Sequence, residues 1–243
     1  LRQKVFAGWP DDGLPLDLKR VFSVVREGVR FSAWDFTSEH DVTLRLYLLE
    51  DAKARPAATV QLKVLDQGDW NNWLGAMRGK FISELADELA RTNDLTTYST
   101  SLEELKQGLS DKHIAVACFA PRGIGLTAWS GDDKRLTRIR RRFMLLGQTL
   151  DGMRVWDIRR AIQALQSVRD RNSVKVELLA SGGESVNTLY ATLFEPEVRR
   201  LDLVNLPKSQ MEGPDYLGVL KVTDIPQVSE LVAAQSELKV ETK

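Results

Sequence analysis

Short apolar runs and amphipathic helical segments alternate along the second half of this chain. Residues 114–119 are apolar throughout, which is typical of a parallel strand buried on both faces. Residues 153–168 follow with apolar side chains three and four positions apart, which predicts an amphipathic helix, and residues 174–179 are predicted as a second strand. Because strands that alternate with helices run parallel in one sheet, this order predicts an α/β fold with helices on both faces of the sheet.

The first third of the chain has a different period. Residues 42–49 alternate between apolar and polar side chains, as half-exposed strands do, and the neighbouring predicted strands are 21–25, 29–34 and 59–65. Together they indicate an antiparallel opening to the sheet. Residues 1–20 contain two glycines and two prolines and are predicted to be an irregular arm or linker, so that the domain comprises residues 21–243. The remaining predicted elements are helices at 81–91, 186–194 and 229–236 and strands at 201–204 and 238–242.

Charge and hydropathy exclude several kinds of partner. The 34 basic residues balance the 34 acidic ones, so no global field attracts nucleic acid, and no nucleic-acid partner is predicted. No apolar stretch approaches the ~20 residues that a membrane span needs. We therefore expect a soluble domain of unknown compartment, and a secreted or periplasmic location within a longer precursor stays open. One basic cluster is interpreted as a solvated or interdomain salt-bridge surface: Lys134, Arg135, Arg138, Arg140, Arg141 and Arg142.

The sequence also argues against metal and cofactor sites. Cys118 is the only cysteine, and its place in an apolar run predicts a buried, unreactive thiol. One cysteine and two distant histidines, His40 and His113, cannot make a zinc site. No Gly-x-Gly-x-x-Gly motif follows a strand, which argues against a dinucleotide site. No metal and no cofactor are predicted.

Functional groups of an open parallel sheet gather at the carboxyl ends of its strands. Three such ends carry polar or glycine-rich turns, at residues 66–70, 120–125 and 180–185. The tryptophans of the first turn, Trp70 and Trp73, are the best candidates for stacking on sugar rings. The candidate binding residues at these ends are Asp66, Gln67, Gly68, Trp70, Arg122, Gly182 and Gly183.

These motifs, in this order, resemble those of the α/β-hydrolase superfamily. Residues 122–125, Arg-Gly-Ile-Gly, are similar to the Arg-Gly-x-Gly turn of acetyl xylan esterases and prolyl-oligopeptidase-like esterases. Residues 147–162 resemble the helix that leads to their nucleophile strand, and residues 189–191 the helix after the nucleophile. The resemblance implies a three-layer αβα sandwich with a mostly parallel sheet, antiparallel N-terminal strands and a truncated C-terminal end.

The resemblance also implies where a nucleophile should lie. An intact elbow reads Gly-x-Ser-x-Gly, because its strained turn needs small neighbours around the serine. The alignment puts Ala180, Gly182 and Glu184 on the Gly, Ser and Gly positions, so the nucleophile position is a glycine. Two shifted registers stay open, with Ser181 or Ser185 as the nucleophile. A serine near a helix start is more often an N-cap.

The catalytic base and the oxyanion site depart from the pattern as well. In this fold the base follows the nucleophile in the chain, but no histidine occurs after His113. Asp66 and Asp69 flank the position of the oxyanion donors, where carboxylates would oppose negative charge. Without its base a serine hydroxyl stays protonated at neutral pH.

The sequence therefore predicts a catalytically degenerate esterase-like domain. Its expected role is that of a structural or interaction module beside a catalytic domain or subunit, in a larger acetyl xylan esterase-like protein. One alternative is an active carboxylic-ester hydrolase, for a carbohydrate ester, that uses Ser181 or Ser185. The other is a carbohydrate-binding module that uses Trp70 and Trp73.

Overall fold

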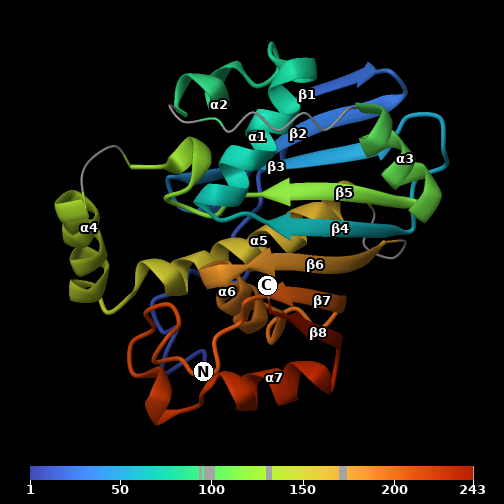
Figure 1. Cartoon of the computed structure of the whole chain (residues 1–243). Coiled ribbons are helices and arrows are strands. Elements are labelled where there is room, and N and C mark those ends of the chain that lie inside the picture. The colour runs from blue at the N-terminus through green and yellow to red at the C-terminus, as the bar shows by residue number, and fades with distance from the viewer. Residues whose placement is uncertain (93–94, 96–101, 130–132, 170–173, 243) are drawn as a thin grey trace.

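The computed structural model describes the whole chain apart from residues 93–94, 96–101, 130–132, 170–173 and 243. Its centre is one eight-stranded mixed sheet with the order β1-β2-β3-β5-β4-β6-β7-β8 (Figure 1). The first three strands are antiparallel, and β3 pairs antiparallel with β5. From β5 to β8 all neighbours are parallel. The strands are Lys19–Arg26 (β1), Val29–Glu39 (β2), Val42–Asp51 (β3), Thr59–Val64 (β4), Ile114–Phe119 (β5), Lys175–Ser181 (β6), Val198–Val204 (β7) and Glu237–Glu241 (β8).

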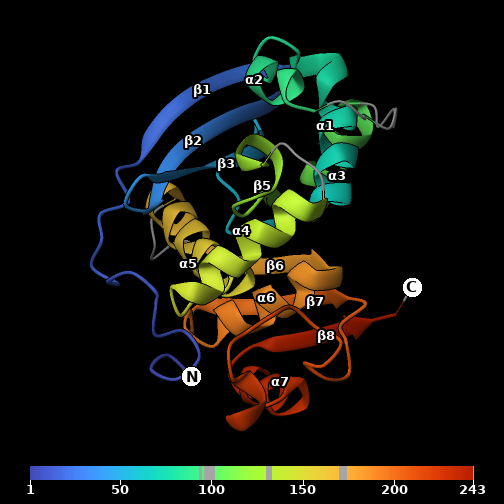
Figure 2. The same cartoon turned by 90° about the vertical axis from the view of Figure 1, so that its left-hand side faces the viewer.

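Helices cover the two faces of the sheet unequally. The back face in Figure 1 packs against α5, α6 and α7, whereas α1, α2 and α3 lie over the front of β1, β2, β3 and β5 only (Figures 1 and 2). Two apolar cores result, one on each side of the sheet. The helices are Gln67–Phe81 (α1), Ala86–Ala90 (α2), Leu102–Lys112 (α3), Asp133–Leu145 (α4), Leu150–Arg169 (α5), Gly182–Thr192 (α6) and Ile225–Ala233 (α7), with short turns Gly125–Thr127 (η1) and Val219–Lys221 (η2).

The predicted α/β class is confirmed, and one predicted helix is wrong. In place of a helix at 81–91, α1 runs from Gln67 to Phe81, and α2 is a separate short helix. The Asp66 side chain caps α1 by accepting a hydrogen bond from the backbone N–H of Asp69 at 2.8 Å. The buried residues of α1 have helical spacing, so the segment has both a start signal and an apolar face: Trp70, Leu74, Met77 and Phe81.

The N-terminal segment lies on the domain instead of extending away from it. Its backbone is irregular up to β1, which begins at Lys19, and Val5, Phe6 and Trp9 are buried in the larger core. The rings of Phe6 and Trp9 stack with centroids 4.4 Å apart, and the Trp9 indole N–H donates to the carbonyl of Gly152 in α5 at 2.7 Å. Burial of two aromatic rings is a large stabilising contribution, which explains why this segment is held in place.

In the described part of the chain, no helix combines the length and the apolar character that crossing a membrane requires.

Candidate functional site

The carboxyl ends of β4 and β6 lie next to each other at one edge of the sheet. The two strands are parallel neighbours, with Val64 paired to Ala180. The residues that follow them are Asp66, which caps α1, and Gly182, which begins α6. This edge is the one where functional groups of a parallel sheet are expected.

Gly182 has the backbone conformation of a tight strand-to-helix turn. Its φ is +55°, in the left-handed region that side chains rarely adopt. A Cβ atom at this position would lie 3.7 Å from the nearest side-chain oxygen, Oδ2 of Asp66, so there is space for a side chain. The position therefore lies against the Asp66 carboxylate and carries no functional group.

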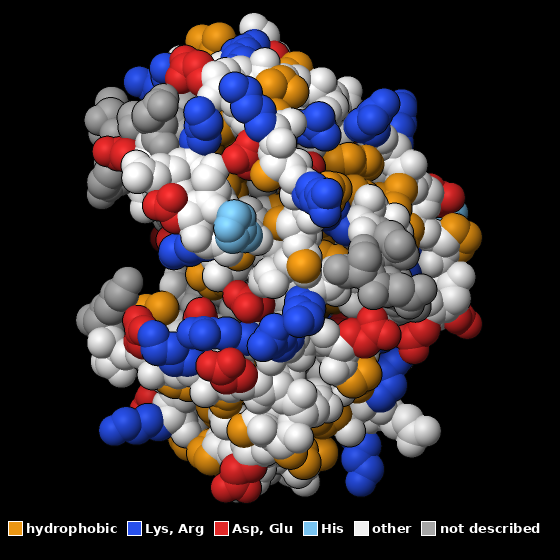
Figure 3. All heavy atoms as spheres, turned by 90° about the vertical axis from the view of Figure 1, so that its right-hand side faces the viewer, with side chains coloured by type: hydrophobic (Ala, Val, Ile, Leu, Met, Phe, Trp, Pro, Cys, Tyr) orange, Lys and Arg blue, Asp and Glu red, His pale blue; other side chains and the backbone are white. Residues whose placement is uncertain are grey.

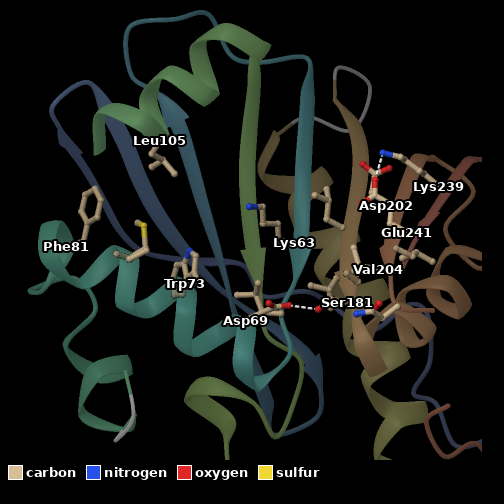
Figure 4. Close-up of a pocket in the computed structure, with 18 of the residues that line it drawn as sticks. Lys63, Asp69, Trp73, Phe81, Leu105, Ser181, Asp202, Val204, Lys239 and Glu241 are labelled. Atoms are coloured by element: carbon tan, nitrogen blue, oxygen red, sulfur yellow. Dashed lines mark hydrogen bonds and ion pairs between the residues drawn. The ribbon is translucent and has the colours of Figure 1, made fainter. Parts of the chain in front are cut away.

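The two serines beside Gly182 are both engaged. The Ser181 hydroxyl donates to Oδ2 of Asp69 at 2.7 Å (Figure 4). The Ser185 hydroxyl donates to the Gly182 carbonyl at 2.6 Å, within the first turn of α6, and this residue is buried. Ser181 thus lies against a carboxylate, and Ser185 satisfies the helix backbone.

The two histidines lie away from these serines. His113 precedes β5, so it lies at the amino end of the parallel strands, opposite to Ser181. His40 lies in the turn between β2 and β3, and its highly exposed ring pairs with Asp41. Three strands separate β2 from β6, which is roughly 19 Å at about 4.8 Å per step. No hydrogen bond joins either histidine to a serine in the part of the chain that the structure describes.

A groove of about 800 Å³ extends from this edge over the uncovered front of the sheet. One wall is apolar, with Trp73 and Phe81 from α1 and Leu105 from α3 (Figure 4). The floor consists of front-facing side chains of β4, β6, β7 and β8, and the surface is visibly hollowed between the two halves of the molecule in Figure 3. The floor residues are mostly polar or charged: Lys63, Leu179, Ser181, Asp202, Val204, Lys239 and Glu241.

This groove explains the alternation of the last strands. In β7 and β8, Leu201, Leu203 and Leu238 pack in the core, while Asp202, Val204, Lys239 and Glu241 line the groove. A strand that packs against helices on one face alone has a polar second face, because that face contacts water. The expectation of helices on both faces therefore holds for β2, β3 and β5 but not for β1 or β6–β8 among the described residues.

The turn after β4 differs from the loop that the sequence suggests. Asp66, Gln67 and Gly68 are the cap and first turn of α1, and the Gln67 side chain bonds to Asn71. Trp70 points into the smaller core and is 1% exposed, in ring contact with Tyr47 and Trp73. A buried indole has no free face for a sugar, which argues against stacking by Trp70. Trp73 is half-buried and lines the groove.

Arg122 is an internal ion-pair residue and not an exposed binding residue. It is 5% exposed, and its guanidinium donates to both carboxylate oxygens of Asp157, at 2.7 and 2.8 Å, and to Glu39 at 2.7 Å. These acceptors neutralise the charge inside the domain, which argues against the predicted role of Arg122 in ligand binding. Arg122 instead ties the turn after β5 to α5 and β2.

Sequence reasoning missed a buried polar network on the other side of Gly182. Glu184, 2% exposed, accepts from Arg154 at 3.0 Å and from the Asn187 amide at 2.9 Å. The Tyr216 hydroxyl donates to Oδ1 of Asn187 at 2.5 Å. Burial raises the pKa of Glu184 to about 7, although the Arg154 charge opposes this shift. A glutamate in the first turn of a helix with helically spaced apolar residues was the one available signal.

Replacing Glu184 by glutamine is expected to flatten the pH dependence of stability. The folded domain keeps this carboxyl protonated to a higher pH than the unfolded chain, where its pKa is 4.5. The stabilising contribution is therefore complete below the unfolded pKa and is lost as the pH rises through about 7. Urea unfolding at about pH 5 and about pH 8 should differ by up to about 3 kcal/mol less in Glu184→Gln than in the wild type. The exposed Glu230→Gln variant should keep the wild-type slope, and an unchanged slope in Glu184→Gln would contradict the assignment.

No three potential metal ligands among His, Cys, Asp and Glu gather within the described ranges. Cys118 is buried, as predicted, and burial raises the pKa of its thiol to about 12. The thiol is therefore protonated and inert at neutral pH.

Comparison with known proteins relates this fold to esterases. No protein-family model and no curated protein sequence matches the chain. Among solved structures, a putative acetyl xylan esterase from Bacteroides fragilis NCTC 9343 matches with a TM-score of 0.65 and 13% identity, over 96% of this chain and 64% of that protein. A glucuronoyl esterase from Solibacter usitatus matches with a TM-score of 0.61 and 11% identity, over 96% of this chain and 69% of the other. An acetyl xylan esterase from Paenibacillus sp. R4 gives a TM-score of 0.50 at 10% identity, over 79% and 54%.

At these identities the likeness shows the fold alone. The chain is an α/β sandwich of the α/β-hydrolase type with esterase-like neighbours. It spans 64% of the length of the Bacteroides protein.

Proposed function

We propose that this chain, whose fold is that of acetyl xylan and glucuronoyl esterases, is a catalytically inactive esterase-like domain that serves as a structural or interaction module. The observation that supports this most is Gly182. It follows β6 directly, opens α6 with a φ of +55° and has no side chain where the resemblance requires an attacking oxygen. Its natural place is beside an active domain or subunit of a larger acetyl xylan esterase-like protein.

The surroundings of Gly182 support the same proposal. Asp66 and Asp69 supply negative charge next to the position where an oxyanion would form, which disfavours that charge. The Ser181 hydroxyl has a carboxylate partner but no imidazole to accept its proton during attack. Loss of a nucleophile and of a base each lowers the rate of acyl transfer by orders of magnitude.

The chain is expected to hydrolyse p-nitrophenyl acetate no faster than its Ser181→Ala and Ser185→Ala variants. Gly182→Ser restores a hydroxyl without a base and is expected to stay inactive as well. Initial rates, measured against an active acetyl xylan esterase as positive control, test both statements. A fall of about 10³-fold or more in Ser181→Ala alone would identify Ser181 as a nucleophile and overturn the proposal.

A second candidate function is carbohydrate binding in the groove. Trp73 favours it, because this half-buried indole forms part of a wall opposite Lys63, Asp202 and Lys239. A rigid aromatic face combined with polar side chains is a common arrangement in ligand sites. Quenching of tryptophan fluorescence by xylan oligosaccharides would support this candidate.

A further inference from the structure

We propose that α4 is a peripheral membrane-binding element that docks on an anionic lipid surface. This helix stands apart from the sheet at the left of Figure 1, at the edge where β4, β5 and β6 end. In Figure 2 this side of the molecule faces the viewer. None of its residues is buried. Helices of globular proteins usually bury one apolar face, so a 13-residue helix with no buried side chain is unusual and suggests that its surface contacts something outside the domain.

One side of α4 holds the helix on the domain. Arg140 donates to Asp151 at 3.1 Å and to Asp215 at 3.4 Å. The ring of Phe143 contacts Trp129 with centroids 6.5 Å apart, and Ile139 is half-buried. These residues share one helical face, because positions three and four apart lie on the same side. The opposite side is consequently directed away from the domain.

The outward side combines cations with a bare leucine. Lys134, Arg138, Arg141 and Leu145 lie at positions i, i+4, i+7 and i+11, and all four are exposed. None of the three cations pairs with an acid in the part of the chain that the structure describes. Leu145 is 86% exposed and Leu146 is 76% exposed. A concentrated positive field thus surrounds two of the most exposed leucines of the described residues.

This combination selects a lipid surface among possible polyanions. Nucleic acid or an acidic polysaccharide would neutralise the cations but would leave both leucines in water. An anionic bilayer offers lipid phosphates to the cations and an acyl boundary to the leucines. The balance of 34 basic and 34 acidic residues over the whole chain means that the attraction is local to this helix. The proposed contact is peripheral and is independent of the groove and of esterase chemistry.

Vesicle flotation tests the proposal with the wild-type chain. We expect binding to vesicles of phosphatidylcholine with phosphatidylglycerol, weaker binding at high salt, and little binding to phosphatidylcholine alone. Arg138→Glu/Arg141→Glu and Leu145→Ser/Leu146→Ser should each weaken binding by at least about tenfold. These side chains are exposed, so far-UV circular dichroism and thermal unfolding should match the wild type.

A matched control lies at the opposite edge of the sheet. Lys53 and Arg55, exposed in the connection between β3 and β4, can be reversed as Lys53→Glu/Arg55→Glu without touching α4. This variant should bind vesicles like the wild type. Absence of wild-type binding to anionic vesicles would overturn the proposal. So would equal loss in the control variant, or wild-type affinity in Leu145→Ser/Leu146→Ser, which would indicate a general polyanion surface.

Discussion

Replacing Asp157 by alanine is expected to lower the free energy of unfolding by about 3–5 kcal/mol. Asp157 is fully buried in α5 and accepts four hydrogen bonds. Three come from the backbone and guanidinium of Arg122, at 2.7 to 3.0 Å, and one from the Ser38 hydroxyl at 2.6 Å. Removing the carboxylate leaves a buried guanidinium without its main counter-charge. Water cannot reach this guanidinium to replace the lost hydrogen bonds, so the cost is large.

Urea unfolding measures this effect, with Asp202→Ala as the matched control. Asp202 also pairs with an arginine, Arg200, at 2.8 Å. The side chains of this pair are 31% and 27% exposed, so the pair is much less buried than that of Asp157 and Arg122. The control should cost at most about 1 kcal/mol, because solvent screens the pair. Equal effects of Asp157→Ala and Asp202→Ala would show that the interior pair does not hold the turn after β5.

Replacing Trp9 by alanine is expected to cost about 3–5 kcal/mol, which is as large as a mutation in the centre of the core. The Trp9 indole is 6% exposed, stacks on Phe6 and lies 5.2 Å from the guanidinium carbon of Arg159. Its N–H bond to Gly152 would be lost together with the buried apolar area. Truncation also leaves a cavity against α5 that the irregular segment can fill only in part.

The control for Trp9→Ala is Lys4→Ala in the same segment, because Lys4 is exposed. It should leave the midpoint of urea unfolding unchanged. If Trp9→Ala also leaves the midpoint unchanged, residues 1–9 are an arm that does not contribute to the stability of the domain, as residues 1–20 were interpreted from sequence alone.

Much of the fold was predictable because its signals are local. The apolar run that became β5 and the helical spacing that became α5 depend on neighbours within one element. The helix at 67–81 was equally visible in the spacing of Trp70, Leu74, Met77 and Phe81, but the interpretation of residues 66–70 as a functional turn obscured it. Candidate positions at strand ends were also predictable, because parallel strands end at one edge.

The contacts of the candidate site could not be predicted in this way. Ser181 meets Asp69 across 112 positions of sequence, and Arg122 meets Asp157 across 35. Nothing in the pattern distinguishes a buried Trp70 from a Trp73 at the groove, since both belong to one helix and differ by less than one turn. Which of two neighbours faces solvent depends on how the helix is rotated on the sheet.

The sequence by itself determined the α/β class, the antiparallel start followed by alternating strands and helices, and the lack of any histidine after His113, because period and composition are properties of the chain alone. Only the tertiary structure decided which charges are neutralised internally, as at Arg122, and which remain outward, as on α4. The physical reason is that packing between distant elements sets burial and pairing. The sequence around an arginine therefore does not show whether its charge is paired inside the domain, as for Arg122, or exposed to solvent, as on α4.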